Sequence, residues 1–392
     1  MSEDPHLIGR MAAPLVQGIQ SQDVAACVKH FALNNQECDR LSVDTKVDDK
    51  TLFELYLLAF YDALMEGGSY SVMGAYNKYD GEFCCENATL LKKILRDLWH
   101  YDGVTISDWG GVHNTEKTAL NGVDMEMSVT PDFDDYKLAN PLLEKVKSGK
   151  IDESVIDERI ERILTMMERI KLGDKTRNKG CTNTKDHQQT IQQIAEEGIV
   201  LLKNEDNMLP MENNKKLNVF GWASTNPCYG GTGSGSLSDA YETVSLLQGL
   251  ENAGFELNSE LSDFYKDYRA ERPEVGMWEQ DWTLPEPTVD SYSEDLIKNA
   301  QDFSDTALVV ITRVGGEGAD LPTDVSKVTY TDNSKDYKDF EPGEHYLQLS
   351  QTEKNMLDMV CSDFDNVVVV YNGANAMELG FLNDYEQIKG AV

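Results

Sequence analysis

The sequence predicts an α/β fold in two successive parts, because strand-like and helix-like segments alternate twice along the chain. Residues 1–172 alternate short apolar runs with segments of helical apolar spacing, and near-continuous Val and Ile runs follow in residues 187–392. The stretch 173–186 (GDKTRNKGCTNTKD) is polar and aperiodic, which is typical of an interdomain linker. A chain of 392 residues is also long enough for more than one domain.

The first part contains strand-like runs that end in polar residues. Its strands are predicted at 25–31, 71–77, 103–109 and 122–127, with helices at 51–66 and 88–99 between them. The C-terminal ends of parallel strands meet at one edge of a sheet or barrel, where chemistry usually takes place. The polar residues at these ends are Lys29 and His30, Tyr76 and Asn77, Ser107 and Asp108, and Asp124 with Glu126. We therefore expect a site at this edge.

A helix over 153–172, with one apolar face and Asp152 as its cap, is predicted to close the first part. The second part begins with a helix over 187–203. Its buried strands are predicted at 217–223, 307–312 and 366–371, with a helix at 351–361 between the last two. Two long loops, 271–291 and 315–343, interrupt this part, and loops of this length are usually functional or mobile.

Both ends of the sequence indicate a fragment of a longer protein. Four barrel-type strands cannot close a barrel of eight. Residues 388–392 (IKGAV) have the pattern of a strand that is just beginning.

The composition excludes several classes of partner. The formal net charge is −34, whereas nucleic acids and anionic membranes need a basic face, so we expect neither partner. No stretch has the length of an apolar membrane span. The seven cysteines are scattered and lack a CxxC pair, so we expect no disulfide framework and no zinc site. Free thiols favour a reducing compartment, and we expect a cytoplasmic location.

Asp108 is the candidate nucleophile. It follows the strand VTIS and precedes Trp109 and two glycines, so a rigid strand holds a carboxylate that opens to a cleft beside an aromatic platform. The alternative is an aspartate that only begins a turn. Lys29 and His30 follow another strand and could bind sugar hydroxyls and keep a carboxylate ionised, or form a salt bridge beside a core histidine.

Two glycine-rich segments lie in the second part. Glu317 stands in RVGGEGAD (313–320) directly after a strand, and the flanking glycines let the loop project a carboxylate as a general acid, or form only a turn. The run 230–235 (GGTGSG) is similar to a phosphate cradle but lacks the Lys-Ser/Thr ending of a P-loop and the helix after GxGxxG. We expect it to be a structural or sugar-adjacent loop.

Taken together, these motifs resemble the family 3 glycoside hydrolases, in particular the β-glucosidase-like branch. The resemblance covers nearly the whole chain in family order and spacing. It rests on 29–37 (KHFALNNQE), 72–77 (VMGAYN) with Gly81 and 85–87 (CEN), 107–109 (SDW), 122–127 (GVDMEM), 198–204 (GIVLLKN), 230–235 and 316–320 (GEGAD).

The resemblance implies a (β/α)8 TIM-like barrel followed by an α/β sandwich domain, with the active site between them. Residues 1–172 would be the C-terminal part of the barrel, 173–186 the linker, and 187–392 a sandwich domain truncated at its C-terminus. Carried over by motif, Asp108 is the nucleophile and Glu317 the general acid/base. The implied sugar ligands are Lys29 and His30, the aromatic wall is Trp109, and the further lining is Met73 and Tyr76.

The chain departs from the family pattern in two respects. An Arg and an earlier Asp that hold the glycone in the family would lie before residue 1. Leu321 stands where the family often has Arg after the acid/base motif.

The resemblance therefore implies a retaining, exo-acting β-glucosidase that needs no cofactor and no metal. Its substrate would be an oligosaccharide or an aryl or alkyl β-glycoside, and homo-oligomers are compatible with the sequence. Two alternatives stay open: the same mechanism on β-xylosides, arabinosides or N-acetylglucosaminides, and an inactive fragment of such an enzyme.

Overall fold

The computed structural model describes residues 3–212, 215–231, 233–235, 237, 243–270, 282–328, 338–373 and 375–392. The chain forms two compact units, Met1–Thr184 and Lys185–Val392. Each unit has a hydrophobic core of its own.

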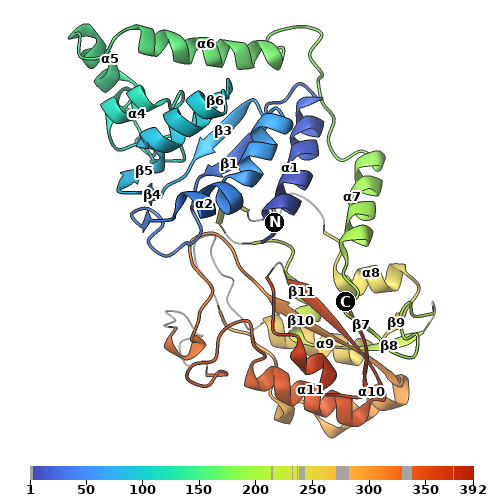
Figure 1. The fold of residues 1–392 in the computed structure, drawn as a ribbon. Coiled ribbons are helices and arrows are strands. Elements are labelled where there is room, and N and C mark those ends of the chain that lie inside the picture. Colours follow the sequence, from blue (N-terminus) through green and yellow to red (C-terminus); the bar gives the residue numbers. More distant parts are fainter. Residues whose placement is uncertain are drawn as a thin grey trace. The chain divides into compact units, whose positions relative to one another are not determined.

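The first unit is built on a three-stranded parallel sheet in the order β1-β3-β6 (Figure 1). Its strands are β1 (Cys27–Phe31), β3 (Ser71–Gly74) and β6 (Val104–Ile106), close to three of the predicted strands. The strand predicted at 122–127 is reduced to one bridge between Met125 and Ile106. The N–H groups of Asp124 and Met125 both donate to the carbonyl of Thr105, at 2.8 and 3.2 Å, and the N–H of Ser107 donates to the carbonyl of Met125 at 2.9 Å.

Helical segments connect these strands, as predicted for an α/β fold. The predicted helix 51–66 is a succession of short α and π turns: α2 (Asp49–Thr51), η1 (Leu52–Tyr56), α3 (Leu58–Tyr61) and η2 (Asp62–Glu66). The predicted helix 88–99 is η4 (Thr89–Leu98), and Oδ1 of Asn87 accepts the N–H of Leu90 at its first turn. The buried face of η4 joins the core that contains Phe31.

The remaining elements of the first unit surround this sheet. The sequence did not predict α1 (Pro5–Gln20), which Asp4 caps by accepting the N–H groups of His6 and Leu7. A small second sheet has the order β2-β4-β5. The other elements are β2 (Asp44–Thr45), β4 (Lys78–Tyr79), β5 (Glu82–Phe83), η3 (Cys84–Glu86), α4 (Thr115–Asn121), η5 (Phe133–Asp135) and α5 (Asn140–Lys147).

Helix α6 (Ser154–Arg169) occupies the predicted segment 153–172. Asp152 accepts the N–H of Ser154 at 3.0 Å, although Glu153 takes the capping position. The predicted apolar face is only partly covered within the unit, since Ile160 and Leu164 are exposed. The buried side chain of the helix is Arg159, which donates to the carbonyls of Val123 and Thr118. Arg159 is therefore the buried contact of α6, while Val155 and Ile156 of the apolar face pack partly buried against the core.

The second unit is built on a six-stranded sheet in the order β7-β12-β11-β10-β8-β9. Neighbouring strands are parallel except for the pair β12–β7. The predicted strands 217–223, 307–312 and 366–371 are present, and the segment 388–392 contains a strand. The strands are β7 (Lys203–Asn204), β8 (Lys216–Phe220), β9 (Glu256–Leu257), β10 (Thr306–Arg313), β11 (Asn366–Gly373) and β12 (Ile388–Ala391).

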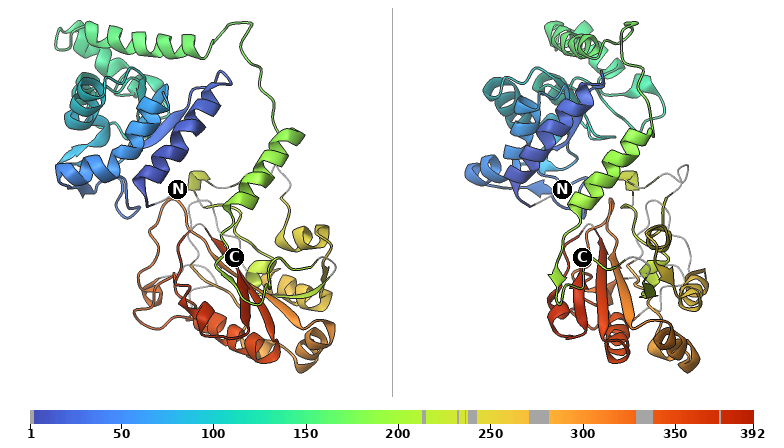
Figure 2. Two further views of the ribbon diagram at one scale, coloured as in Figure 1. Left: turned by 45° about the vertical axis from the view of Figure 1, so that its right-hand side comes forward. Right: turned by 90° about the vertical axis from the view of Figure 1, so that its right-hand side faces the viewer.

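Helices pack along this sheet (Figure 2). The predicted helix 187–203 ends earlier, as α7 (Lys185–Gly198), and the chain then extends into β7. The predicted helix 351–361 is α11 (Gln351–Asp363), which begins with a capping box of Ser350 and Glu353. Parts of the two predicted loops, 271–281 and 329–337, lie outside the described residues. The other elements are η6 (Trp222–Ser224), η7 (Gly233–Gly235), α8 (Leu246–Asn252), α9 (Ser259–Ala270), η8 (Val289–Ser291), α10 (Glu294–Phe303), η9 (Val325–Lys327) and η10 (Gly380–Asn383).

Candidate active site

Asp108 lies two residues after the end of β6 and is buried, with 5% of its surface exposed. Its Oδ1 accepts the N–H of Trp109 at 2.8 Å, and its Oδ2 lies 3.4 Å from Nε2 of His30. The preceding Ser107 fixes the strand end, because its hydroxyl accepts the N–H of Met127 at 2.8 Å. Each oxygen of the Asp108 carboxylate thus faces a nitrogen.

The two glycines after Trp109 are required by the turn that presents Asp108. Gly110 has a φ of +75°, a conformation that L side chains rarely adopt. A Cβ on Gly111 would lie 3.3 Å from the carbonyl oxygen of Asp108 and 3.4 Å from Sγ of Cys85. The Trp109 side chain, by contrast, is 50% exposed, as an aromatic platform requires.

His30 and Lys29 belong to β1, at the other edge of the sheet from β6. His30 is half-buried and faces Asp108, while Lys29 is exposed. The pairing of β1 with β3 is irregular between Val28 and Phe31, around these two residues. The structure therefore places His30 next to the candidate nucleophile, whereas Lys29, in the same strand, is exposed to solvent.

Met73 and Tyr76 come from β3, the central strand, and the segment that follows it. Met73 is buried and Tyr76 is half-buried. The guanidinium carbon of Arg40 lies 5.0 Å from the centroid of the Tyr76 ring, and Nη1 of Arg40 lies 3.0 Å from Oε2 of Glu37. Our sequence analysis quoted the motif that ends at Glu37 but did not single out Arg40, which lies just beyond it.

Three other polar residues at the predicted strand ends have structural partners. Asn77 is fully buried and donates to the carbonyl of Lys78 at 3.1 Å. The carboxylate of Asp124 is buried between Arg96 and Arg162, at 3.2 and 2.8 Å. Glu126 accepts the N–H of Leu138 at 2.7 Å. The ion pairs give the Asp124 carboxylate a structural role in the first unit.

Two adjacent thiols are buried in the first unit, next to the turn after Asp108. Cys84 and Cys85 are fully buried, and burial raises the pKa of the Cys84 thiol to about 12. Burial raises the pKa of Cys85 as well. Sγ of Cys85 would lie 2.6 Å from a Cβ on Gly74, so the thiol packs directly against β3. Both thiols stay protonated at neutral pH and act as packing groups.

Glu317 lies in the second unit, four residues after the end of β10, and is half-buried. Its Oε2 accepts the backbone N–H of Ser234 at 2.8 Å and also accepts the Ser234 hydroxyl. The run 230–235 therefore contacts the candidate acid/base, in line with the prediction of a structural or sugar-adjacent loop. Thr232 of this run lies outside the described residues.

The loop that carries Glu317 is anchored by a buried ion pair. Arg313, the last residue of β10, is fully buried and holds the carboxylate of Glu353 through two nitrogens, at 2.9 and 2.8 Å. Arg313 also donates to the carbonyls of Tyr346 and Gln348. Burial by itself lowers the pKa of Arg313, but the Glu353 carboxylate more than offsets it, so the pKa is raised. Arg313 is therefore fixed and charged.

Leu321, which stands where the resemblance leads us to expect an Arg, packs on the core of the second unit. Its Cδ2 would lie 3.5 Å from a Cβ on Gly315. The substitution thus makes an apolar contact at the base of the Glu317 loop.

A second buried carboxyl group in this unit was missed by the sequence analysis. Glu286 accepts the N–H of Trp222 at 2.9 Å and the hydroxyls of Tyr292 and Tyr265 at 2.9 and 3.1 Å. Burial raises the pKa of Glu286 to about 8. Because residues 271–291 were predicted as a long loop, nothing in the local pattern indicated that Glu286 is buried.

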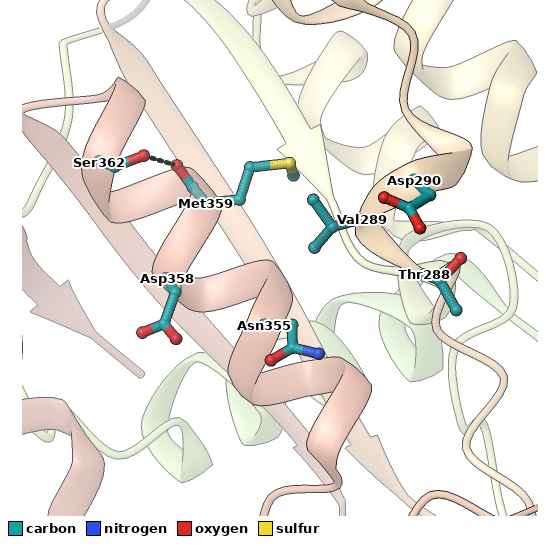
Figure 3. A pocket seen from close by; sticks show the side chains of 7 residues that line it. All are labelled: Thr288, Val289, Asp290, Asn355, Asp358, Met359 and Ser362. Atoms are coloured by element: carbon teal, nitrogen blue, oxygen red, sulfur yellow. Dashed lines mark hydrogen bonds between the residues drawn. The ribbon is translucent and has the colours of Figure 1, made fainter.

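An open groove of about 600 Å³ lies between α11 and η8, away from every predicted site residue of this unit (Figure 3). Most of its lining residues have polar side chains and are exposed, and Asp358, on its α11 side, accepts the hydroxyl of Tyr385 at 2.7 Å. The candidate residue Glu317 does not line this groove. The groove is lined by Thr288, Val289, Asp290, Asn355, Asp358, Met359 and Ser362.

Among the residues that the structure describes, no group of three or more His, Cys, Asp or Glu side chains could hold a metal ion. No helix in this part of the chain has the length and apolar character needed to cross a membrane.

Comparison with known proteins identifies the family of the chain. The model of the glycosyl hydrolase family 3 N-terminal domain matches residues 1–166, and that of the family 3 C-terminal domain matches residues 199–392. Beta-glucosidase BoGH3A of Bacteroides ovatus is 31% identical over 99% of this chain and 50% of its own length. Thermostable beta-glucosidase B of Acetivibrio thermocellus is 31% identical over 99% of this chain and 46% of its own length. The chain thus spans about half the length of these curated relatives.

Solved structures give the same result. Beta-glucosidase 3B from Thermotoga neapolitana in complex with glucose superposes with a TM-score of 0.82 at 32% sequence identity. The match covers 100% of this chain and 52% of that protein. The fold is therefore α/β, with a TIM-like unit followed by an α/β sandwich unit. Family models that match most of the chain, together with these relatives, show that the chain belongs to glycosyl hydrolase family 3.

Proposed function

We propose that the protein hydrolyses terminal non-reducing β-D-glucosyl residues of β-glucosides and oligosaccharides, with retention of configuration. The observation that carries the proposal is the buried Asp108 carboxylate at the end of β6, with Trp109 N–H on one oxygen and His30 facing the other. A fixed carboxylate beside an exposed aromatic ring suits attack on a sugar carbon. The similarity to β-glucosidases supports the reaction class.

The reaction would take place in two steps. In the first, Asp108 attacks the anomeric carbon, the glycosidic C–O bond breaks, and Glu317 gives its proton to the leaving oxygen. In the second, Glu317 takes a proton from water, whose oxygen displaces Asp108 from the anomeric carbon. The mechanism requires the two carboxyl groups to come within about 5–5.5 Å of each other when substrate is bound.

The other residues of the first unit would form the glycone pocket. Lys29 and His30 would bind sugar hydroxyls, and Trp109 would provide an aromatic wall. Met73 and Tyr76 would line the pocket from the central strand. The bound glucose in the Thermotoga neapolitana structure supports glucose as the sugar. The absence of a cofactor requirement, a cytoplasmic location and homo-oligomeric assembly stay predictions.

The test is the rate of the Asp108→Ala variant on an aryl β-glucoside. We expect turnover to fall by about 10⁴-fold or more, since the covalent step is lost. Added azide should restore part of the rate and release a glycosyl azide of inverted configuration. Assays on the matching xyloside, arabinoside and N-acetylglucosaminide show whether the sugar is glucose. Wild-type activity in Asp108→Ala would refute the proposal.

A further inference from the structure

Ser234 gives both of its hydrogen-bond donors to one oxygen of Glu317. Its backbone N–H lies 2.8 Å from Oε2, and its hydroxyl donates to the same atom. The two residues are 83 positions apart in the chain. This contact therefore depends on the tertiary fold of the second unit and not on local loop geometry.

Glycines make this approach sterically feasible. Gly233 has a φ of +74°, and a Cβ on it would lie 2.5 Å from Cβ of Glu317. A Cβ on Gly231 would lie 2.8 Å from the carbonyl oxygen of Gly315. These distances are shorter than non-bonded atoms allow, so side chains at Gly231 and Gly233 would push the two loops apart.

A second contact anchors the chain that leads to Ser234. Asn372, near the end of β11, accepts the N–H of Cys228 at 2.5 Å and donates to its carbonyl at 3.1 Å. This two-way bond fixes the segment six residues before Ser234. The Glu317 loop is fixed at its own base by Arg313. Both partners of the Ser234–Glu317 contact are thus held by the strand ends.

We propose that Ser234 is a positioning residue that fixes the carboxyl group of Glu317 for proton transfer, by donating two hydrogen bonds to its Oε2. The inference rests on the proposed acid/base role of Glu317. When Glu317 gives its proton to the leaving oxygen, the two Ser234 donors stabilise the carboxylate that remains. In the second step Glu317 takes the proton from water, and the covalent structure of Ser234 is unchanged throughout.

The test compares Ser234→Ala with wild type on cellobiose and on dinitrophenyl β-glucoside. Loss of a hydrogen bond to a charged group corresponds to about tenfold or more in rate. We expect kcat/KM on cellobiose to fall by about that factor and kcat/KM on the activated glucoside by less than about twofold. Ser234→Thr, which keeps the hydroxyl, should restore most of the cellobiose rate. The matched control is Ser326→Ala, which removes a serine–carboxylate bond to Asp324 in the same unit and should change neither rate.

Two comparisons separate the possible failures. If Glu317→Ala lowers kcat/KM by the same factor on both substrates, the acid/base role itself is refuted. If Glu317→Ala discriminates between the substrates but Ser234→Ala does not, only the positioning role is refuted.

A measurement without turnover gives a second readout of the contact. Labelling of Glu317 by a water-soluble carbodiimide requires a protonated carboxyl group, and mass spectrometry of peptides reports it. We expect labelling of Glu317 to rise at least about twofold in Ser234→Ala, because a hydrogen-bond donor to the carboxylate is lost. In Ser234→Thr, labelling should be close to the wild-type level. Unchanged labelling would overturn the inference even for a variant with weak activity.

Discussion

His30 and Asp108 lie face to face although they come from opposite edges of the first unit's sheet: Nε2 of His30 is 3.4 Å from Oδ2 of Asp108. The central strand β3 lies between their two strands. Met73 lies at its C-terminal end, and Tyr76 lies in the segment that follows. Parallel strands bring their C-terminal ends together, so residues 78 positions apart in sequence can share one charge-assisted contact.

This contact predicts a defined role for His30. Replacing it in His30→Gln removes a group that faces the nucleophile, and we expect kcat/KM on an aryl β-glucoside to fall by about 10- to 100-fold. His113→Gln is the control, because the His113 ring stacks on Phe83 with centroids 3.7 Å apart instead of facing Asp108. An equal loss in both variants would show that the effect is not specific to the Asp108 contact.

The proposed acid role of Glu317 predicts a dependence on the leaving group. Glu317→Ala should lower kcat/KM on cellobiose by about 10²-fold or more and affect dinitrophenyl β-glucoside far less, because an activated phenol departs without protonation. The matched variant Asp320→Ala changes an exposed carboxylate of the same loop and should not discriminate between the two substrates. If Asp320→Ala discriminates and Glu317→Ala does not, the acid is Asp320.

The buried carboxyl of Glu286 predicts a pH dependence of stability. Its pKa is raised by burial from 4.5 to about 8 in the folded state. Between these values the folded chain retains a proton that the unfolded chain releases, so the free energy of unfolding should decrease as pH rises from about 4.5 to about 8. Urea unfolding at pH 5 and pH 8 measures this decrease.

Glu286→Gln cannot ionise, so the difference between the two pH values should shrink in that variant, whatever its absolute stability. Glu341→Gln, which replaces an exposed glutamate of the same unit, should leave the difference as in wild type. An unchanged pH dependence in Glu286→Gln would contradict the assignment.

Because Arg313 and Glu353 form a buried ion pair, we expect the effects of substituting them on the free energy of unfolding to be strongly coupled. Arg313→Met leaves Glu353 buried without its partner, and we expect a loss of about 3–5 kcal/mol in the free energy of unfolding. The double variant Arg313→Met, Glu353→Met should lose less than the sum of the single variants. The exposed pair of Lys298 and Asp302 is the control and should show little coupling in the same cycle. Additive losses at Arg313 and Glu353 would argue against the coupling.

The sequence predicted most of the second unit's sheet because its strands are encoded locally. Residues 307–312 and 366–371 are almost continuous Val and Ile runs, and β10 and β11 pair over these residues with β10 fully buried. Asp108 became a candidate in the same way, since a strand followed by Trp and two glycines marks its position. Glu317 became a candidate because of the order of the family motifs along the chain. Its glycine-rich loop alone could equally have been a simple turn.

What the sequence did not show depends on contacts between distant segments. The Arg40 guanidinium packs on the Tyr76 ring, and Glu317 accepts a hydrogen bond from Ser234. Glu286 accepts a hydrogen bond from the N–H of Trp222. No local sequence pattern indicates any of these contacts. The strand predicted at 122–127 is reduced to one bridge with β6, and the buried ion pair of its Asp124 with Arg96 and Arg162 is another contact that no local pattern indicates.

The most direct test of the account is to identify the carboxylate that becomes attached to sugar. A 2-deoxy-2-fluoro β-glucoside with an activated leaving group forms a glycosyl-enzyme that hydrolyses slowly, and peptide mass spectrometry locates the label. The account predicts one fluoroglucosyl group per active chain, on Asp108, and no label in Asp108→Ala. A label on any other residue, or turnover with inversion and no covalent adduct, would contradict the assignment of Asp108 as the nucleophile.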